Sequence, residues 1–397
     1  MARFCLIFVY VVTVLFGFEL ASFTAFKFNK ILDGTRNTKG AMERSGLYKN
    51  LDFGKYKNEA RKLERLKIYD PYRSYRVRPN FKGKFVNTDY LGRRFTKGQD
   101  APHNKDEISI AMFGGSTLWG IGSESDLHTI PSLLYSELNK KNTKPFYRVL
   151  NNGVPGYNQT QEMIYLIESL RSQQFNIVIF YDFVNESLHG YREVGRRKDQ
   201  IPLTFLLPQI PTDGQLNKFA GFEKPLISKL KDFIRSLYSY RMLNFLKLKI
   251  RLNKEGNTEV RVFSDNQNRS AQVNRVIENY HHNIKIINAL GRRFQFAPIF
   301  ILQPTLFTKK ALSDFEKTID HLKFKDYIEF EKEVYEKAKV KLVKNNLVKD
   351  LSDVFSNQSN TIYIDDHHMS SIGNKIIAQE IAKFVSESLI GPSHENK

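Results

Sequence analysis

The chain has 397 residues, 41% of them hydrophobic and 26% charged, which is the balance of an ordinary globular protein and excludes wholesale disorder. Its formal net charge of +19 favours an anionic partner, such as a polyanion or a membrane surface. No zinc-finger spacing, RNP motif or basic-zipper heptad accompanies this charge, so we expect no nucleic-acid binding.

The chain begins with an apolar run from Phe4 to Phe18, preceded by Arg3. Such a run before a large polar chain is typical of a targeting segment, and no convincing small-x-small cleavage site follows it. We therefore expect residues 1–26 to be a signal anchor or transmembrane segment, with the rest of the chain extracytoplasmic. A cleaved signal peptide and a buried amphipathic helix are the alternatives. The single cysteine, Cys5, lies in this run, so the remainder forms no disulfide.

Residues 27–107 lack the regular pattern of the rest of the chain. Residues 27–66 are polar and rich in Lys, Asn and Arg, which predicts a tether with some helix. Residues 69–95 combine Pro and Gly with alternating apolar residues, and this pattern predicts an irregular β lead-in that packs on the main domain.

From Ile108 on, apolar runs of strand length alternate with helical stretches. The runs are ISIAMFGG, YRVLNNG, NIVIFYD, APIFILQP and TIYI. Helices are expected to begin near Thr129, Gln159, Ala271, Ser313 and Ser371. This alternation predicts a parallel sheet covered on both faces. We therefore expect residues 108–390 to form an α/β domain, a three-layer α/β/α flavodoxin-like sandwich with a five-stranded parallel sheet.

A basic insertion at about 187–268 interrupts the alternation. It contains the cluster Arg196, Arg197 and Lys198. Solvated helix faces and a binding patch for an anionic substrate or lipid surface are both open interpretations of this charge.

Polar residues and glycines cluster where the predicted strands end. FGGST holds Ser116, GVPGYN holds Gly156, FVNE holds Asn185, and DDHHMSSIG holds Asp365 and His368. Sites in this fold class form beyond the carboxyl ends of the strands, so we expect the four clusters to meet.

These residue types suit nucleophilic attack by a serine. The Ser116 hydroxyl needs a base, and His368 titrates near neutrality. Asp365, three residues earlier on one face of a helical turn, can accept the other ring N–H of the histidine. The Ser116 and Gly156 backbone N–H groups and the Asn185 amide are candidate oxyanion donors. We also expect Ser116 to cap the helix that follows it.

The rest of the sequence predicts neither a metal site nor a cofactor site. We expect no metal, because no Cys/His or Asp/Glu cluster has ligand spacing. No dinucleotide loop or Walker sequence is present, so we expect no cofactor. The other histidines considered are predicted to be structural; these are His189, His281, His282 and His367.

In this order, the four blocks resemble those of the SGNH hydrolases, also called GDSL-type esterases, and the resemblance spans about Ile108–Val385. It implies a Ser, Gly, Asn and His set at the positions named above. Gly115 stands where the family usually has aspartate, in a turn without a role in proton transfer. In the asparagine block, Phe183 stands where the family usually has glycine, and Glu186 stands where it usually has aspartate. We expect Phe183 to crowd the oxyanion pocket.

The resemblance implies a membrane-anchored serine ester hydrolase. Its expected substrate is an acyl ester of a cell-surface carbohydrate or lipid, and the basic insertion favours an anionic one. Two alternatives stay open from the residues alone. One is an O-acyltransferase for a surface polysaccharide, and the other is a catalytically inactive polysaccharide-binding or assembly protein.

Overall fold

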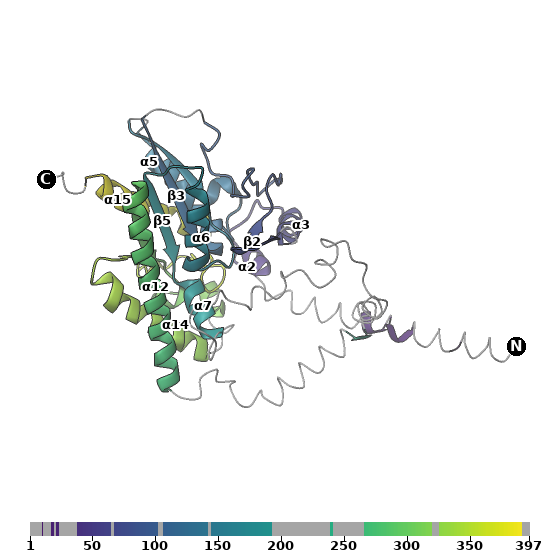
Figure 1. Ribbon diagram of the computed structural model, residues 1–397. Coiled ribbons are helices and arrows are strands. Elements are labelled where there is room, and N and C mark those ends of the chain that lie inside the picture. The colour runs from purple at the N-terminus through teal and green to yellow at the C-terminus, as the bar shows by residue number, and fades with distance from the viewer. Residues whose placement is uncertain are drawn as a thin grey trace, which may run out of the picture. The chain divides into compact units, whose positions relative to one another are not determined.

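The computed structural model describes residues 38–64, 67–101, 106–141, 144–192, 266–319 and 325–390, together with a few isolated positions in 10–23 and 239–240. The chain divides into two units, one of residues 1–40 and 211–261 and the other of residues 41–210 and 262–397. The first unit lies almost wholly outside the described residues. The second carries the sheet and the candidate site (Figure 1).

The sheet of the second unit has five parallel strands. They are β3 (Glu107–Gly114), β4 (Phe146–Asn151), β5 (Ile177–Asp182), β6 (Ala297–Leu302) and β7 (Lys349–Asp350). Their spatial order is β4-β3-β5-β6-β7, and every neighbouring pair is parallel. In chain order this is the 2-1-3-4-5 arrangement of the flavodoxin-like class. The predicted fold class is confirmed.

Helices follow each strand. The α-helices of the α/β part are α4 (Ser116–Trp119), α5 (Ile130–Leu138), α6 (Gln159–Ser169), α7 (Val184–Arg192), α12 (Asn266–Phe294), α13 (Asp314–Ile319), α14 (Lys325–Ala338) and α15 (Ser371–Ile390). Short 3-10 turns cover Asp126–His128 and Leu306–Thr308, and a π-helix covers Lys339–Val343. The expected helix starts agree with α5, α6, α13 and α15, whereas α12 begins earlier than Ala271.

Successive side chains of each strand point to opposite faces of the sheet, and helices cover both faces. Ala111 and Phe113 of β3 belong to a core shared with α6, α12 and α14, and in Figure 1 α6 and α12 lie in front of the sheet. Ile110 and Met112 belong to the core on the other face, shared with α5 and α15. The sheet is therefore the middle layer of three, and its carboxyl edge is left for the site.

The fifth strand is not the predicted one. Residues 361–364, TIYI, form no strand, and Tyr363 makes only an isolated bridge. The N–H groups of Ile362 and Tyr363 donate to Glu316 Oε1 at 2.8 and 3.0 Å, so a buried carboxylate takes the place of a neighbouring strand. The actual fifth strand, β7, has two residues and is too short to produce an apolar run.

Residues 41–64 pack into the domain instead of forming a tether. They contribute to α2 (Thr38–Arg44) and α3 (Phe53–Glu64), and Met42, Tyr48 and Tyr56 are buried in the core on one face of the sheet. The Tyr48 hydroxyl donates to the Gly122 carbonyl at 2.7 Å, next to the candidate site. The expected β lead-in forms an antiparallel hairpin of β1 (Lys67–Asp70) and β2 (Ser74–Val77).

Two predicted segments lie mainly outside the described residues. Only residues 187–192 and 266–268 of the basic insertion belong to continuous described stretches, where they complete α7 and begin α12. The cluster Arg196, Arg197 and Lys198 is not among them, and neither is most of the apolar run 4–18. Within the part of the chain that is described, no helix combines the length and apolar character needed to span a membrane.

Replacing Glu316 by glutamine should destabilise the fold strongly. Lys309 and Glu316 form an ion pair in which both side chains are fully buried. Glu316→Gln leaves the ammonium group without its counter-charge, and we expect the free energy of unfolding to fall by about 3–5 kcal/mol, measured by equilibrium urea denaturation. Asp314→Asn, which weakens the exposed pair with Lys317, is the control and should leave the free energy of unfolding nearly unchanged. Equal losses would contradict the prediction.

Candidate active site

A continuous hydrogen-bonded chain joins three of the predicted residues at the carboxyl edge of the sheet. Ser116 follows β3, and its Oγ lies 2.7 Å from Nε2 of His368. The other ring nitrogen of His368, Nδ1, lies 2.7 Å from Oδ2 of Asp365. All three side chains are largely withdrawn from solvent. The structure thus brings the predicted serine, histidine and aspartate together in the predicted order.

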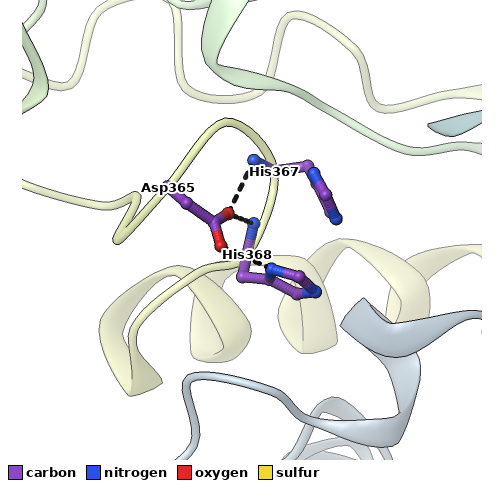
Figure 2. Close-up of side chains that lie close together, drawn as sticks. All are labelled: Asp365, His367 and His368. Atoms are coloured by element: carbon purple, nitrogen blue, oxygen red, sulfur yellow. Dashed lines mark hydrogen bonds and ion pairs between the residues drawn. The ribbon is translucent and has the colours of Figure 1, made fainter. Parts of the chain in front are cut away.

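The loop that carries Asp365 and His368 is not the helical turn that was expected. Oδ1 of Asp365 accepts the N–H groups of His367 and His368 at 3.1 and 2.7 Å (Figure 2). Ile364 N–H donates to the His368 carbonyl at 2.9 Å. The carboxylate therefore orients both the backbone of the loop and the imidazole ring. Burial favours the neutral acid, but the charge and hydrogen bond of His368 outweigh it and lower the pKa of Asp365 to about 2.

Ser116 is the first residue of α4 and not its cap. The N-cap is Gly115, and no side chain caps this four-residue helix. The expectation that Ser116 caps the helix is therefore wrong, because its hydroxyl is engaged by His368. The serine still lies at a strand-to-helix turn, with its hydroxyl directed at the base.

The three predicted oxyanion donors lie just after β3, β4 and β5 in the chain. Gly156 has φ +89°, a conformation that favours glycine. The N–H groups of Ser116 and Gly156 have no hydrogen-bond acceptor among the described residues. One amide N–H of Asn185 donates to the Tyr157 carbonyl at 2.6 Å, which leaves the second for an oxyanion. Ser116 and Asn185 line the same pocket.

Phe183 does not crowd this pocket. Its backbone has φ +97°, a strained conformation for a bulky residue, and this rotates the side chain into the core. The ring is fully buried and lies 4.2 Å from the ring of Tyr280 on α12. The expected crowding is therefore wrong, because a left-handed backbone turns the ring away from the oxyanion donors.

Glu186 connects the two oxyanion loops. Its carboxylate accepts the N–H of Gln159 at the start of α6 and the N–H of Phe183 after β5, both at 2.7 Å. Burial raises the pKa of Glu186 although these two N–H groups oppose the rise. Burial, together with the carboxylates nearby, also raises the pKa of Asp182 and Glu162 well above the usual range. The acids behind the oxyanion donors thus favour protonated forms more than exposed acids do.

Two histidines predicted to be structural lie at the site. Nε2 of His189 lies 3.1 Å from the Gly156 carbonyl, in the peptide that follows the proposed Gly156 N–H donor. His367 lines the pocket that contains Ser116, and its ring centroid lies 4.0 Å from that of His368. No spacing rule in the sequence identifies either residue, because His189 lies on α7 and His367 in a bend, and tertiary contacts bring both to the site. His281 and His282 lie on α12 and do not line the pocket.

The pocket is small and largely polar. Its empty space is about 210 Å³, part of which is open solvent at the mouth. The residues that line it are Gly115, Ser116, Thr117, Tyr157, Tyr181, Asp182, Val184, Asn185, Glu186, Gln303 and His367. A pocket of this size accommodates a short chemical group better than a long chain.

Neither a family model nor a curated protein matches this chain. Solved structures do show a likeness. An acetylxylan esterase of Geobacillus stearothermophilus is 12% identical, with a TM-score of 0.34 over 72% of this chain and 95% of that one. A carbohydrate acetylesterase of Sinorhizobium meliloti is 14% identical, with a TM-score of 0.33 over 71% and 99%. A member of the lipolytic G-D-S-L family from Veillonella parvula is 11% identical, with a TM-score of 0.36 over 70% and 98%. At such identities and TM-scores, the function of this chain rests on its own residues.

A methyl group on Gly115 should disable the oxyanion site without disturbing the fold. The added Cβ would lie 2.2 Å from Asn185 Nδ2, which must then move away. Because Nδ2 is the end of a side chain, the backbone can stay in place. We expect Gly115→Ala to lower kcat by about 100- to 1000-fold with a nearly unchanged melting temperature. Gly54→Ala, where the nearest atom is 3.4 Å away, is the control. Full activity of Gly115→Ala would exclude Asn185 as a donor.

Proposed function

We propose that this protein is a serine ester hydrolase of the SGNH type. The observation that carries the proposal is the chain of 2.7 Å contacts from Ser116 through His368 to Asp365, with Asn185 lining the same pocket as Ser116. The order of the four sequence blocks supports it independently. A histidine whose Nδ1 is bonded to a carboxylate presents Nε2 to the serine in the tautomer that accepts a proton.

The proposed reaction has two steps. Ser116 Oγ attacks the ester carbonyl while His368 takes its proton, and the N–H groups of Ser116, Gly156 and Asn185 stabilise the oxyanion. His368 then returns the proton to the departing alcohol oxygen as the tetrahedral intermediate collapses to an acyl-serine. In the second step His368 takes a proton from water, whose oxygen attacks the acyl-serine, and the acid leaves as Ser116 regains its proton.

The proposed substrate carries a short acyl group on a carbohydrate or lipid of the cell surface. The small, polar pocket supports a short acyl group, since a long chain requires a longer apolar channel. The net charge of +19 supports an anionic substrate or lipid surface. Rates on a series of aryl esters from acetate to octanoate test the acyl length.

The triad variants should rank in a defined order on an aryl acetate. Ser116→Ala should abolish turnover and labelling by a fluorophosphonate probe, because no other activated serine is expected. His368→Ala should lower turnover by several orders of magnitude, and Asp365→Ala should be severe but somewhat milder. Asp366→Ala is the matched control and should stay within about tenfold of the parent, or about 1.4 kcal/mol. Labelling at a different serine would overturn the assignment.

We further propose that residues 1–26 anchor the protein to a membrane, with the domain outside the cytoplasm. The apolar run from Phe4 to Phe18 supports this. The full chain should stay with membranes through a carbonate wash. A chain lacking residues 1–26 should be soluble and active, because the described core begins at Ala41. If expression of the full chain instead yields a protein that is free of membranes and shortened at its N-terminus, the segment is a cleaved signal peptide.

A further inference from the structure

The Gly156 N–H, a proposed oxyanion donor, belongs to the central peptide of a β-turn. The turn covers residues 154–157, VPGY, and the Tyr157 N–H donates to the Val154 carbonyl at 3.0 Å. Proline at the second position and a φ of +89° at the third, Gly156, identify a type II turn. Its central peptide joins the carbonyl of Pro155 to the N–H of Gly156. The donor N–H and the Pro155 carbonyl therefore turn together.

The carbonyl of this peptide accepts a hydrogen bond from Tyr75 on β2. The Tyr75 hydroxyl lies 2.6 Å from the Pro155 oxygen, although the two residues are 80 positions apart in the chain. The Tyr75 side chain is fully buried, and burial raises the pKa of its hydroxyl. The hydroxyl therefore keeps its proton and acts as a donor to the turn.

Tyr75 and Tyr157 bind each other's segments reciprocally. The Tyr157 hydroxyl donates to the Tyr75 carbonyl, and the two rings pack edge to face with their centroids 5.2 Å apart. The Tyr157 carbonyl also accepts the Asn185 amide at 2.6 Å. The hairpin of β1 and β2 thus contacts the turn that carries one proposed oxyanion donor and binds the amide of another.

We propose that Tyr75 is a positioning residue for the oxyanion donor Gly156. Type I and type II turns differ mainly by about a half-turn of the central peptide, which reverses the directions of its N–H and C=O groups. The hydrogen bond from Tyr75 holds the Pro155 carbonyl toward the hairpin, so the Gly156 N–H points the opposite way. A carbonyl that accepts a hydrogen bond also strengthens the N–H of its own peptide as a donor. The inference rests on the proposed ester hydrolysis, in which this N–H stabilises the oxyanion.

Tyr75→Phe tests the inference, because it removes the hydroxyl and keeps the ring in the core. On an aryl acetate we expect kcat to fall by about 10- to 100-fold, less than for outright loss of an oxyanion donor. KM should stay nearly unchanged, because the oxyanion forms only as the reaction proceeds. The pH dependence of kcat/KM should keep its midpoint, because His368 keeps its contacts with Ser116 and Asp365.

Tyr56→Phe is the matched control. Tyr56, on α3, is also a buried tyrosine, and its hydroxyl donates to the Ser123 carbonyl at 3.3 Å, in a peptide that contains no proposed oxyanion donor. Both variants should melt at a slightly lower temperature than the parent, but only Tyr75→Phe should lose kcat. Full kcat in Tyr75→Phe, or an equal loss in both variants, would overturn the inference. A Tyr75→Phe chain that does not fold would assign the hydroxyl to the fold alone and overturn it as well.

A second substitution perturbs the same peptide from within the turn. Gly156→Ala places a side chain at a φ of +89°, which favours the type I turn, and should lower kcat at least as much as Tyr75→Phe. If both changes act on one peptide, the double variant should have about the kcat of Gly156→Ala alone. Losses that multiply in the double variant would overturn the inference.

The proposed function and the role of Tyr75 can fail separately. A parent that hydrolyses no ester and takes up no fluorophosphonate probe would overturn the proposed function. Hydrolysis that Ser116→Ala abolishes and Tyr75→Phe leaves at the full rate would overturn only the positioning role.

Discussion

The contact between Ser116 Oγ and His368 Nε2 is the interaction on which the site depends, because it joins residues 252 positions apart in the chain. β3 fixes the serine through its parallel neighbours on both sides. The histidine has no such strand behind it. Its loop is held instead by the fully buried Glu316, which binds the backbone at Ile362 and Tyr363 and is neutralised by Lys309. A buried ion pair in place of a strand thus sets the position of the base.

The oxyanion donors depend on a different set of contacts behind the sheet edge. His189 contacts the Gly156 carbonyl, the Tyr157 carbonyl accepts from the Asn185 amide, and Glu186 accepts N–H groups from both segments. The strained backbone of Phe183 is part of this arrangement, at a cost of about 1–3 kcal/mol. Burial of its ring against Tyr280 offsets that strain. Donors held in this way need little reorganisation when negative charge develops, which is where preorganised sites gain their effect.

The features that depend on the spacing of apolar residues could be predicted from the sequence. Four strands, their flavodoxin-like order and the placement of Ser116, Gly156 and Asn185 just after β3, β4 and β5 follow from periodicity and from the geometry of parallel sheets. His368 reaches Ser116 from a loop that follows no strand of the sheet. The fifth strand was predicted at the wrong place, residues 361–364. An apolar run is equally compatible with a buried loop whose N–H groups bind a side chain, so periodicity alone could not distinguish the two. The left-handed backbone of Phe183 and the positions of His189 and His367 are set by tertiary contacts. No local pattern encodes them.

The wide separation of the two halves of the site also has a consequence during synthesis. The chain emerges with Ser116 first, and 252 residues must follow before His368 exists. At about 5–20 residues per second, this takes roughly 13–50 s. During that interval the serine hydroxyl has no imidazole to remove its proton and stays a weak nucleophile. A chain that stalls, or is cut, before residue 368 therefore carries a serine without its base, and synthesis of the loop that holds His368 is the step that activates the serine.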